Sequence, residues 1–385
     1  MNEWIFMTFL NISVGTLAAL ISYFLTFALI KISHQFDLLD YPAGRKIHKK
    51  PMPFLGGVSI FIAFWCVVFG GLLTTHIFKG AYQRFDFFSH VPIGILDLSP
   101  KIVGIFIGSL IILGVGLLDD KFRWSPVRKL TGQVLAAGIL MGLGLTINLF
   151  SDLGVLGYGI TFVWILLIIN AFNFIDSLDG HCTGIALISS VMFFWMTQIM
   201  EQPMVGVFLI TFAGALIGFL PHNFKPAKIF LGDNGSLFVG YIMAAFTLLC
   251  RYQAPRSSFA TLFIPVLIFG VPIYDMLSVI AVRFARGSAP WEGDRNHFAH
   301  RLVKIGMSDK IAVIFSYFVA FTIGHIAVLT TQVDYFGAVL IGIIFLSMIG
   351  LIAFLEYYAA QRARIIEKLS KKMRRRKEDI QKADL

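Results

Sequence analysis

The sequence predicts an all-α integral membrane protein, and three observations support this. Hydrophobic residues make up 57% of the 385 residues and charged residues only 14%, with a mean hydropathy of +0.79. One soluble core cannot bury so large an apolar fraction. About eleven stretches meet or approach the roughly 20 apolar residues that a helix needs to cross a bilayer. In addition, Lys and Arg are concentrated in every second connection between these stretches, as in membrane proteins whose basic loops stay on the cytoplasmic side.

The predicted spans follow one another through most of the chain. They cover residues 4–30, 54–75, 101–118, 130–148, 153–170, 184–200, 204–220, 237–250, 259–282, 311–330 and 335–359. The eighth is short for a crossing, and we expect it to extend at one end. Together they predict a polytopic membrane domain over residues 1–359, followed by a basic tail over residues 360–385 that attracts anionic lipid.

The positions of Lys and Arg predict the orientation of this domain. With the N-terminus outside, the cytoplasmic connections and the tail hold 27 of the 32 basic residues. The C-terminus is then cytoplasmic, and the formal net charge of +10 reflects topology rather than nucleic-acid binding. Only 3 cysteines are present, which argues against a disulfide scaffold and against a cysteine-rich metal protein.

Ionisable groups are costly near a membrane, so those that gather on the cytoplasmic side indicate function. Asp119 and Asp120 end the third span, and two adjacent carboxylates repel each other unless a cation or a proton lies between them. The pair therefore predicts a metal or proton site. The alternative is a solvated helix end that Lys121 and Arg123 neutralise.

Four amide and acid side chains follow at intervals of three residues around the end of the fifth span: Asn170, Asn173, Asp176 and Asp179. On a helix only neighbours in this series share a face, as Asn173 and Asp176 do. Their oxygen atoms are hard ligands that suit Mg²⁺. The alternative is helix capping with Gly180 as the stop, although capping needs only one or two such residues.

A short glycine-rich segment precedes the eighth span. Asp233 follows Gly232 there and comes shortly before Gly235 and Ser236. Glycines let the backbone approach a phosphate closely, and the aspartate is a candidate metal ligand. The alternative is an ordinary turn with Ser236 as a helix N-cap.

The connection over residues 283–310 concentrates polar side chains that suit phosphate binding. They are Asp294, Arg295, His297, His300, Arg301 and Lys304. The two histidines are potential Zn²⁺ ligands, but neither a cysteine nor a further histidine lies nearby in the sequence to complete a tetrahedral set. A topogenic loop would explain the basic residues but not the histidines and the aspartate beside them.

The connection between the first two spans carries four basic or imidazole side chains at headgroup depth. They are Arg45, Lys46, His48 and Lys49. Such residues suit the phosphate of a lipid, whereas on their own they would indicate only a topogenic loop.

Five elements between residues 37 and 304 resemble, in this order, those of the polyprenyl-phosphate N-acetylhexosamine-1-phosphate transferase family. They are D-x-P-x-x-R-K-x-H with P-x-P-x-x-G-G, the Asp pair, N-x-x-N-x-x-D-x-x-D-G, G-D-x-G-S and D-R-x-H-x-x-H. The resemblance implies a membrane enzyme that transfers a sugar 1-phosphate from a UDP-sugar to undecaprenyl phosphate. It also implies UMP as the product, and Mg²⁺ as the cofactor with Mn²⁺ as a substitute. The chain looks most like the branch that uses UDP-N-acetylglucosamine and initiates cell-surface glycans.

The resemblance also implies roles for individual residues. Asp233 would be a Mg²⁺ ligand with Asn173 as a helper, and Asp119 and Asp120 would lie nearest the chemistry. The remaining roles are substrate contacts: Asp176 and Asp179 at the nucleotide sugar, His297, His300, Arg295 and Arg301 at the diphosphate, Arg45, Lys46, His48 and Lys49 at the lipid phosphate, and Asn170 and Asp294 beside them.

Two departures from the family pattern bear on these roles. Ala299 stands where the family often has a histidine, and Ser177 stands where it usually has glycine. The peptidoglycan branch, which uses UDP-N-acetylmuramoyl pentapeptide, usually carries three consecutive histidines in this loop. Their absence here argues against that branch, which stays as the alternative.

A different class, an ion-coupled secondary transporter, would place its acids near the membrane midplane, whereas these acids lie at predicted helix ends. The expected partners are a UDP-sugar, undecaprenyl phosphate and membrane lipids, with no nucleic acid, and a homodimer stays open. We expect the bacterial plasma membrane as the location, with the active site on its cytoplasmic face.

Overall fold

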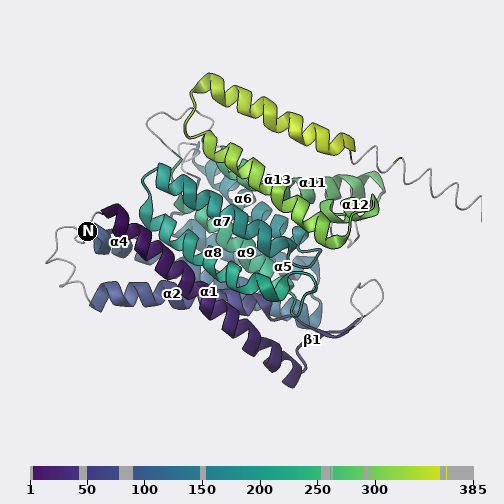
Figure 1. Ribbon diagram of the computed structural model, residues 1–385, viewed down its shortest axis with the longest axis horizontal. Helices are drawn as coiled ribbons and strands as arrows, with labels where there is room; N and C mark the ends of the chain where they lie inside the picture. The colour runs from purple at the N-terminus through teal and green to yellow at the C-terminus, as the bar shows by residue number, and fades with distance from the viewer. Residues whose placement is uncertain are drawn as a thin grey trace, which may run out of the picture.

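The computed structural model describes residues 3–42, 50–77, 90–147, 153–252, 263–289 and 296–355, with 261, 291, 294 and 361. Within these residues the chain forms a bundle of helices (Figure 1). The long helices are α1 Glu3–Gln35, α2 Gly56–Ile77, α4 His90–Phe122, α5 Pro126–Gly142, α6 Val155–Ile175, α7 His181–Ile199, α8 Pro203–Asn223, α9 Gly232–Leu249, α11 Gly270–Ala285 and α13 Asp309–Leu329. Two short helices, α10 Ile264–Ile268 and α12 Phe298–Lys304, and a further helix Tyr335–Leu355 complete the described part.

Eight helices in the described part are long and apolar enough to cross a membrane. Each of the eleven predicted stretches overlaps a helix, but three of the stretches correspond to none of these eight helices. α5 has only 17 residues, α9 begins with the polar turn at Asp233 and Asn234, and the stretch 259–282 is divided between α10 and α11 at Phe269. The structure therefore supports a multi-pass helical membrane protein without establishing eleven crossings.

A two-stranded antiparallel pair interrupts the all-helical pattern. Strand β1, Leu39–Asp40, pairs with β2, Met52–Pro53, and Leu39 lies opposite Pro53. The all-α prediction missed this pair because two residues are too few to show an alternating pattern. The Phe230 N–H donates to the Pro53 carbonyl at 2.8 Å, so the pair is joined to the segment that precedes α9.

Helix α9 is the centre of the bundle. It packs against α2, α4 and α6, and every residue from Asn234 to Leu248 is buried. Glycines make the closest approaches possible: a Cβ on Gly57 would lie 2.3 Å from the Gly235 Cα, and one on Gly116 would lie 2.2 Å from the Asn234 Cα. The first turn of α9 is thus held between α2 and α4 by backbone contact.

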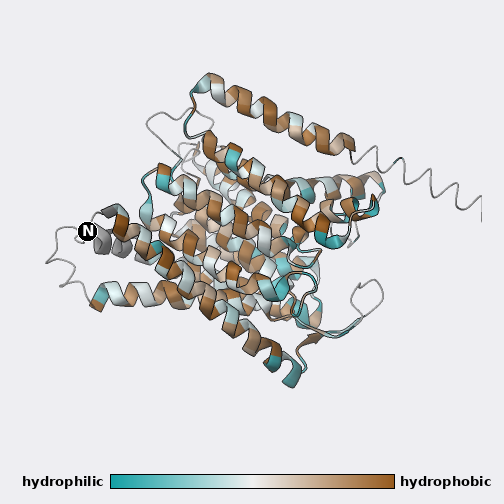
Figure 2. Ribbon diagram, in the orientation of Figure 1, coloured by the Kyte–Doolittle hydropathy of each residue, from teal (hydrophilic) through white to brown (hydrophobic). Residues whose placement is uncertain are grey.

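The outer surface of the bundle is apolar. Figure 2 shows hydrophobic residues along the helices, and many of the hydrophilic ones lie in connections near β1, α5 and α12. Large side chains such as Phe9 and Phe24 are about two-thirds exposed, at 67% and 64%, as expected where lipid replaces water. Helix Tyr335–Leu355 lies beside α13 in Figure 1 and packs through Phe345, Met348 and Ile352.

Candidate active site

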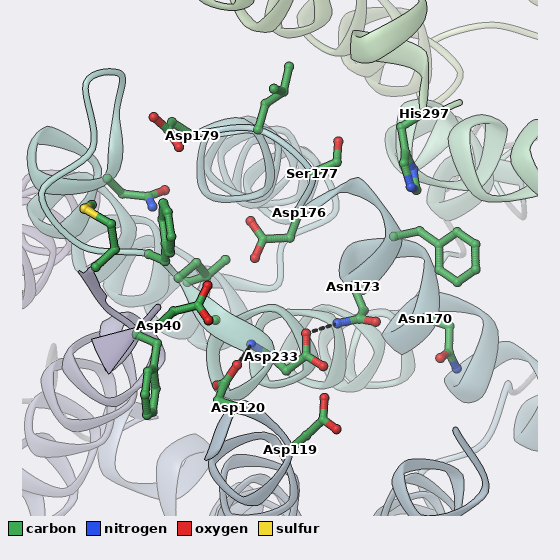
Figure 3. A pocket seen from close by; sticks show the side chains of 18 of the residues that line it. Asp40, Asp119, Asp120, Asn170, Asn173, Asp176, Ser177, Asp179, Asp233 and His297 are labelled. Atoms are coloured by element: carbon green, nitrogen blue, oxygen red, sulfur yellow. Dashed lines mark hydrogen bonds between the residues drawn. The ribbon is translucent and has the colours of Figure 1, made fainter. Parts of the chain in front are cut away.

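A pocket of about 1020 Å³ lies where the ends of α4, α6 and α9 meet the connection between α11 and α12. It brings together residues that are far apart in the sequence (Figure 3). The predicted site residues that line it are Asp119, Asp120, Asn170, Asn173, Asp176, Asp179, Asp233, Asp294, His297 and His300. Four of the five predicted clusters are therefore parts of one site.

Asp120 caps the N-terminus of α9. Its Oδ1 accepts the Asp233 N–H at 2.9 Å, and its Oδ2 accepts the Asn234 N–H at 3.0 Å and the Asn234 Nδ2 at 2.6 Å. A carboxylate at this position satisfies N–H groups that have no partner within the helix and complements its dipole. Asp120 therefore fixes the backbone that carries Asp233.

Lys129, at the start of α5, joins two of the carboxylates. Its Nζ lies 3.0 Å from Asp119 Oδ2 and 2.7 Å from Asp233 Oδ2. Burial alone would lower the pKa of the Lys129 ammonium, but Asp233 and Asp119 reverse that effect and raise it. Sequence reasoning missed Lys129 because it is one of several basic residues in a connection whose charge topology already explains.

The series of four at intervals of three residues divides into two pairs. Asn173 Nδ2 donates to Asp233 Oδ1 at 3.0 Å and to Ser236 Oγ at 2.9 Å, and Asp176 lies near the same carboxylate (Figure 3). The pKa of Asp176 is raised well above its usual value by burial first, then by Asp233, Asp120 and Asp179. Asn173 and Asp176 therefore face the acidic centre, as their shared helix face predicted.

The two outer members of the series are engaged elsewhere. Asn170 exchanges hydrogen bonds with Gln133 at 2.7 and 3.3 Å, which joins α6 to α5. Asp179 accepts the Ala227 N–H at 3.3 Å. α6 ends at Ile175, so helical spacing no longer applies to Asp179. No side chain caps α7, whose N-cap is Gly180, so capping does not explain the series.

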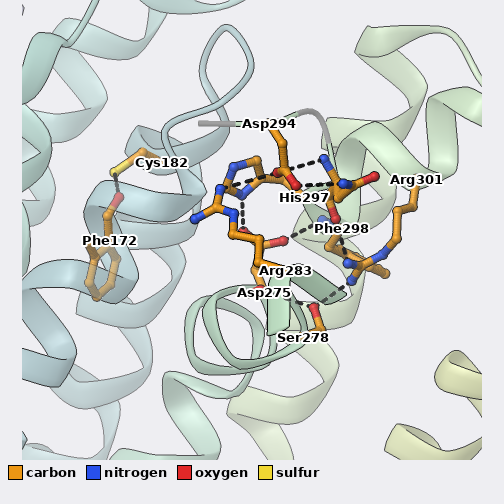
Figure 4. Close-up of polar contacts among 10 residues, drawn as sticks. Phe172, Cys182, Asp275, Ser278, Arg283, Asp294, His297, Phe298 and Arg301 are labelled. Atoms are coloured by element: carbon orange, nitrogen blue, oxygen red, sulfur yellow. Dashed lines mark hydrogen bonds and ion pairs between the residues drawn. The ribbon is translucent and has the colours of Figure 1, made fainter. Parts of the chain in front are cut away.

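The histidine side of the pocket is built from α11, α12 and the connection between them (Figure 4). His297 Nδ1 lies 2.8 Å from Asp275 Oδ2. Arg283 Nη2 donates to Asp294 Oδ1 at 3.2 Å, and its guanidinium lies 5.2 Å from the centre of the Phe174 ring. Burial alone would raise the pKa of Asp294, but hydrogen bonds from Asn296 and Arg283 lower it.

Arg301 does not line the pocket. Its Nη2 donates to Ser278 Oγ at 2.7 Å and its Nη1 donates to the Asn296 carbonyl at 2.5 Å. These bonds hold α12 to α11 and to the connection between them. They direct the guanidinium away from the pocket, so the geometry does not favour the predicted contact of Arg301 with the diphosphate.

Five predicted residues lie outside the described part of the chain: Arg45, Lys46, His48, Lys49 and Arg295. The two departures from the family pattern are described. Ala299 is completely buried in α12, and Ser177 lines the pocket with a buried hydroxyl that has no hydrogen-bond partner among the described residues.

The donor chemistry of the acidic side fits a hard divalent cation. Asp119 and Asp233 present carboxylates to the Lys129 ammonium group, and Asp176 lines the same pocket; Mg²⁺ prefers such oxygen ligands together with substrate phosphates. No three His, Cys, Asp or Glu side chains in the described residues already surround a single ion position. The side chains fit Mg²⁺ by their chemistry and charge, and substrate phosphates would have to complete its ligand set.

Fold and pocket together define a class: a multi-pass helical membrane protein whose polar pocket suits anionic, phosphate-bearing substrates. Residues 102–251 match the sequence profile of glycosyl transferase family 4. The chain is 30% identical to a probable undecaprenyl-phosphate N-acetylglucosaminyl 1-phosphate transferase of Bacillus subtilis strain 168, over 81% of this chain and 83% of that protein.

Two further relatives extend the comparison. An undecaprenyl-phosphate alpha-N-acetylglucosaminyl 1-phosphate transferase of Thermotoga maritima is 31% identical, over 79% of this chain and 87% of its own. A decaprenyl-phosphate N-acetylglucosaminephosphotransferase of Mycobacterium tuberculosis strain H37Rv is 28% identical, over 79% and 78%. The chain belongs to glycosyl transferase family 4, as its motifs indicated.

Proposed function

We propose that this protein transfers N-acetylglucosamine 1-phosphate from UDP-N-acetylglucosamine to undecaprenyl phosphate and releases UMP. The observation that carries the proposal is the single pocket in which the carboxylates of Asp119, Asp176 and Asp233 face a wall bearing His297 and Arg283. The names of the three relatives, which describe this transfer to a polyprenyl phosphate, support it.

The pocket has an acidic wall, with Asp119, Asp120, Asp176, Asp179 and Asp233, and a histidine wall, with Arg283, Asp294, His297 and His300. We assign the two walls different electrostatic roles. Both reactants are anionic, so their negative charge must be neutralised before the acceptor phosphate can approach the β-phosphorus of the nucleotide sugar in line. Asp233 with Asn173 would hold Mg²⁺, which would supply positive charge at the diphosphate. Lys129 keeps Asp233 in place by its 2.7 Å contact, and the histidine wall faces the diphosphate from the other side of the pocket.

Asp119 is the carboxylate that we assign to the acceptor. Asp120 is committed to three hydrogen bonds at the N-terminus of α9, whereas the ion pair of Asp119 is with a side chain, Lys129. When substrate binds, an ion pair between two side chains can rearrange more easily than a carboxylate that caps a helix. Asp119 would receive a proton from the acceptor, or act as a nucleophile toward the β-phosphorus.

The location follows from the distribution of charge. We propose that the pocket faces the cytoplasm of a bacterial cell and that the N-terminus lies outside, because 27 of the 32 basic residues then fall on the cytoplasmic side. UDP-sugars are made in the cytoplasm, so this orientation brings the donor to the pocket, while the acceptor lipid arrives through the membrane.

The test is an assay of the purified protein in detergent with undecaprenyl phosphate, Mg²⁺ and a panel of UDP-sugars, including UDP-N-acetylmuramoyl pentapeptide. UMP release from UDP-N-acetylglucosamine, abolished by EDTA, is the expected result. Release only from the pentapeptide would move the protein to the peptidoglycan branch. No release from any donor, together with substrate uptake into proteoliposomes, would favour a transporter and overturn the proposal.

A further inference from the structure

Asp275 is a carboxylate inside the predicted span 259–282 that the reaction as described does not use. It lies on α11, its side chain is completely buried, and it is not among the residues that line the pocket. Burying an ionisable group is costly unless specific partners compensate for the lost hydration. Its partners therefore show what it does.

Both oxygens of Asp275 bind the segment that carries His297. Oδ2 lies 2.8 Å from His297 Nδ1, and Oδ1 accepts the N–H of Phe298, the first residue of α12. One rigid carboxylate thus fixes the imidazole ring and the backbone next to it. Figure 4 shows Asp275 on α11 beside His297 and Phe298.

The carboxylate also selects the state of the ring. With Asp275 as the acceptor, the proton of a neutral imidazole resides on Nδ1, and Nε2 is left as the nitrogen available to the pocket that His297 lines. The Phe174 ring meets the imidazole edge to face, with centroids 6.0 Å apart. Packing and hydrogen bonding therefore restrict the ring to one orientation.

We propose that Asp275 is a positioning residue that acts through His297: it holds Nδ1–H so that Nε2 points into the pocket and, when the ring carries a second proton, donates to the diphosphate of the bound nucleotide sugar. The inference rests on the proposed transferase function. A purely structural cap for the Phe298 N–H would need only a neutral acceptor such as Asn or Ser. Only a carboxylate caps this N–H and also fixes the imidazole tautomer.

The test is a double-mutant cycle with Asp275→Asn and His297→Gln, assayed by UMP release. Asparagine keeps one oxygen for the Phe298 N–H but presents an amide N–H to Nδ1, which favours the opposite tautomer. We expect Asp275→Asn to lower kcat by about 10- to 100-fold with KM for the donor within about twofold. In the His297→Gln background the same substitution should have no further effect.

Additive losses in the two backgrounds, an unchanged kcat, or a rise in KM alone would overturn the proposal. Asp334→Asn is the matched control, because it makes the same chemical change at an exposed residue near the last helix, away from the pocket. It should leave turnover unchanged.

A measurement on the unmodified protein guards against a variant that does not fold. Nitrogen NMR of histidine-labelled protein in detergent, with the His297 signal assigned by its loss in His297→Gln, should show a proton on Nδ1. A ring protonated at Nε2 alone would refute the positioning role. This readout does not depend on turnover, so an inactive protein in the UMP assay would count against the proposed function alone.

Discussion

The two walls of the pocket handle negative charge in opposite ways. On the acidic wall, Lys129 bridges Asp119 and Asp233, and in the described residues no cation pairs with Asp120, Asp176 or Asp179. On the histidine side, Asp294 in the wall binds Arg283 and Asn296, and Asp275, which lies behind the wall, binds His297 and Phe298.

This difference indicates in which wall the carboxylate charges are already compensated before substrate binds. Neighbouring carboxylates that share one ammonium group retain mutual repulsion, which a divalent cation relieves. Paired acids in a buried network instead rigidify the groups around them. We infer that the charge of the acidic wall is balanced only when cofactor and substrates bind, whereas the charges of the histidine wall are already paired by the fold.

The strongest test of the comparison is Asp233→Asn. The substitution removes the carboxylate that meets both Lys129 and Asn173, and with it the charge that would hold Mg²⁺. We expect UMP release to fall by about 10³-fold and the response to added Mg²⁺ to weaken. Steady-state assays over a Mg²⁺ titration measure both. Unchanged Mg²⁺ dependence would show that the cation binds elsewhere, and Asp334→Asn is again the control.

The second test is Lys129→Met, which removes the shared ammonium group but keeps most of the apolar stem. We expect turnover to fall by about 10²-fold. Without Mg²⁺ the melting temperature should also fall, because Asp119 and Asp233 then repel each other, and added Mg²⁺ should recover more stability than it gives the unmodified protein. Lys121→Met, at an exposed residue of the same connection, is the control. Equal Mg²⁺ effects in the two proteins would contradict the shared-charge interpretation.

The third test is the pH dependence of stability in EDTA. The pKa of Asp176 in the folded protein is raised well above the usual value of 3.8 by burial, Asp233, Asp120 and Asp179. The folded state therefore binds this proton more tightly than the unfolded state, so the contribution of Asp176 to stability is fully present below pH 3.8 and is lost as the pH rises through the folded pKa.

Asp176→Asn should reduce this loss, leaving the variant more stable than the unmodified protein by a few degrees at neutral pH and similar to it in acid. Thermal melts across the pH range provide the measurement. Parallel curves for the two proteins would show that Asp176 is not the group responsible.

The smallest effect is expected for Arg301→Gln, behind the preformed wall. Arg301 binds Ser278 and Asn296 and does not line the pocket. We expect the melting temperature to fall by a few degrees and UMP release to fall by less than about fivefold. Arg286→Gln, at an exposed residue near the end of α11, should change neither. A loss as large as that of Lys129→Met would place Arg301 at the substrate after all.

The sequence predicted the helices well because long apolar stretches are a strong signal in any membrane protein. It predicted the number of crossings less well, for reasons visible in two places. α9 owes its position to neighbours that cover its polar first turn. The break at Phe269 between α10 and α11 lies in a long apolar run, and the length of that run outweighed the local signs of an interruption that Gly270 and Pro272 give.

The acidic residues of the site were predictable because carboxylates at helix ends stand out in an apolar chain. Their partners were not. Lys129 and Asp233 are 104 residues apart, so only the fold brings them together. Asp275 did leave a signal, since it is a lone acid within the predicted span 259–282, and such a residue warrants a functional explanation. The engagement of Asn170 with Gln133 depends on how α5 packs on α6.

The close approach of Gly57 and Gly116 to the first turn of α9 has a consequence for assembly of the protein in the membrane. Without these neighbours the first turn of α9 would lose both its close backbone packing and the Asp120 carboxylate that accepts the Asp233 and Asn234 N–H groups. The polar turn that positions Asp233 therefore depends on α2 and α4 being in place. The site exists only in a fully assembled bundle, so an incompletely inserted chain remains inactive.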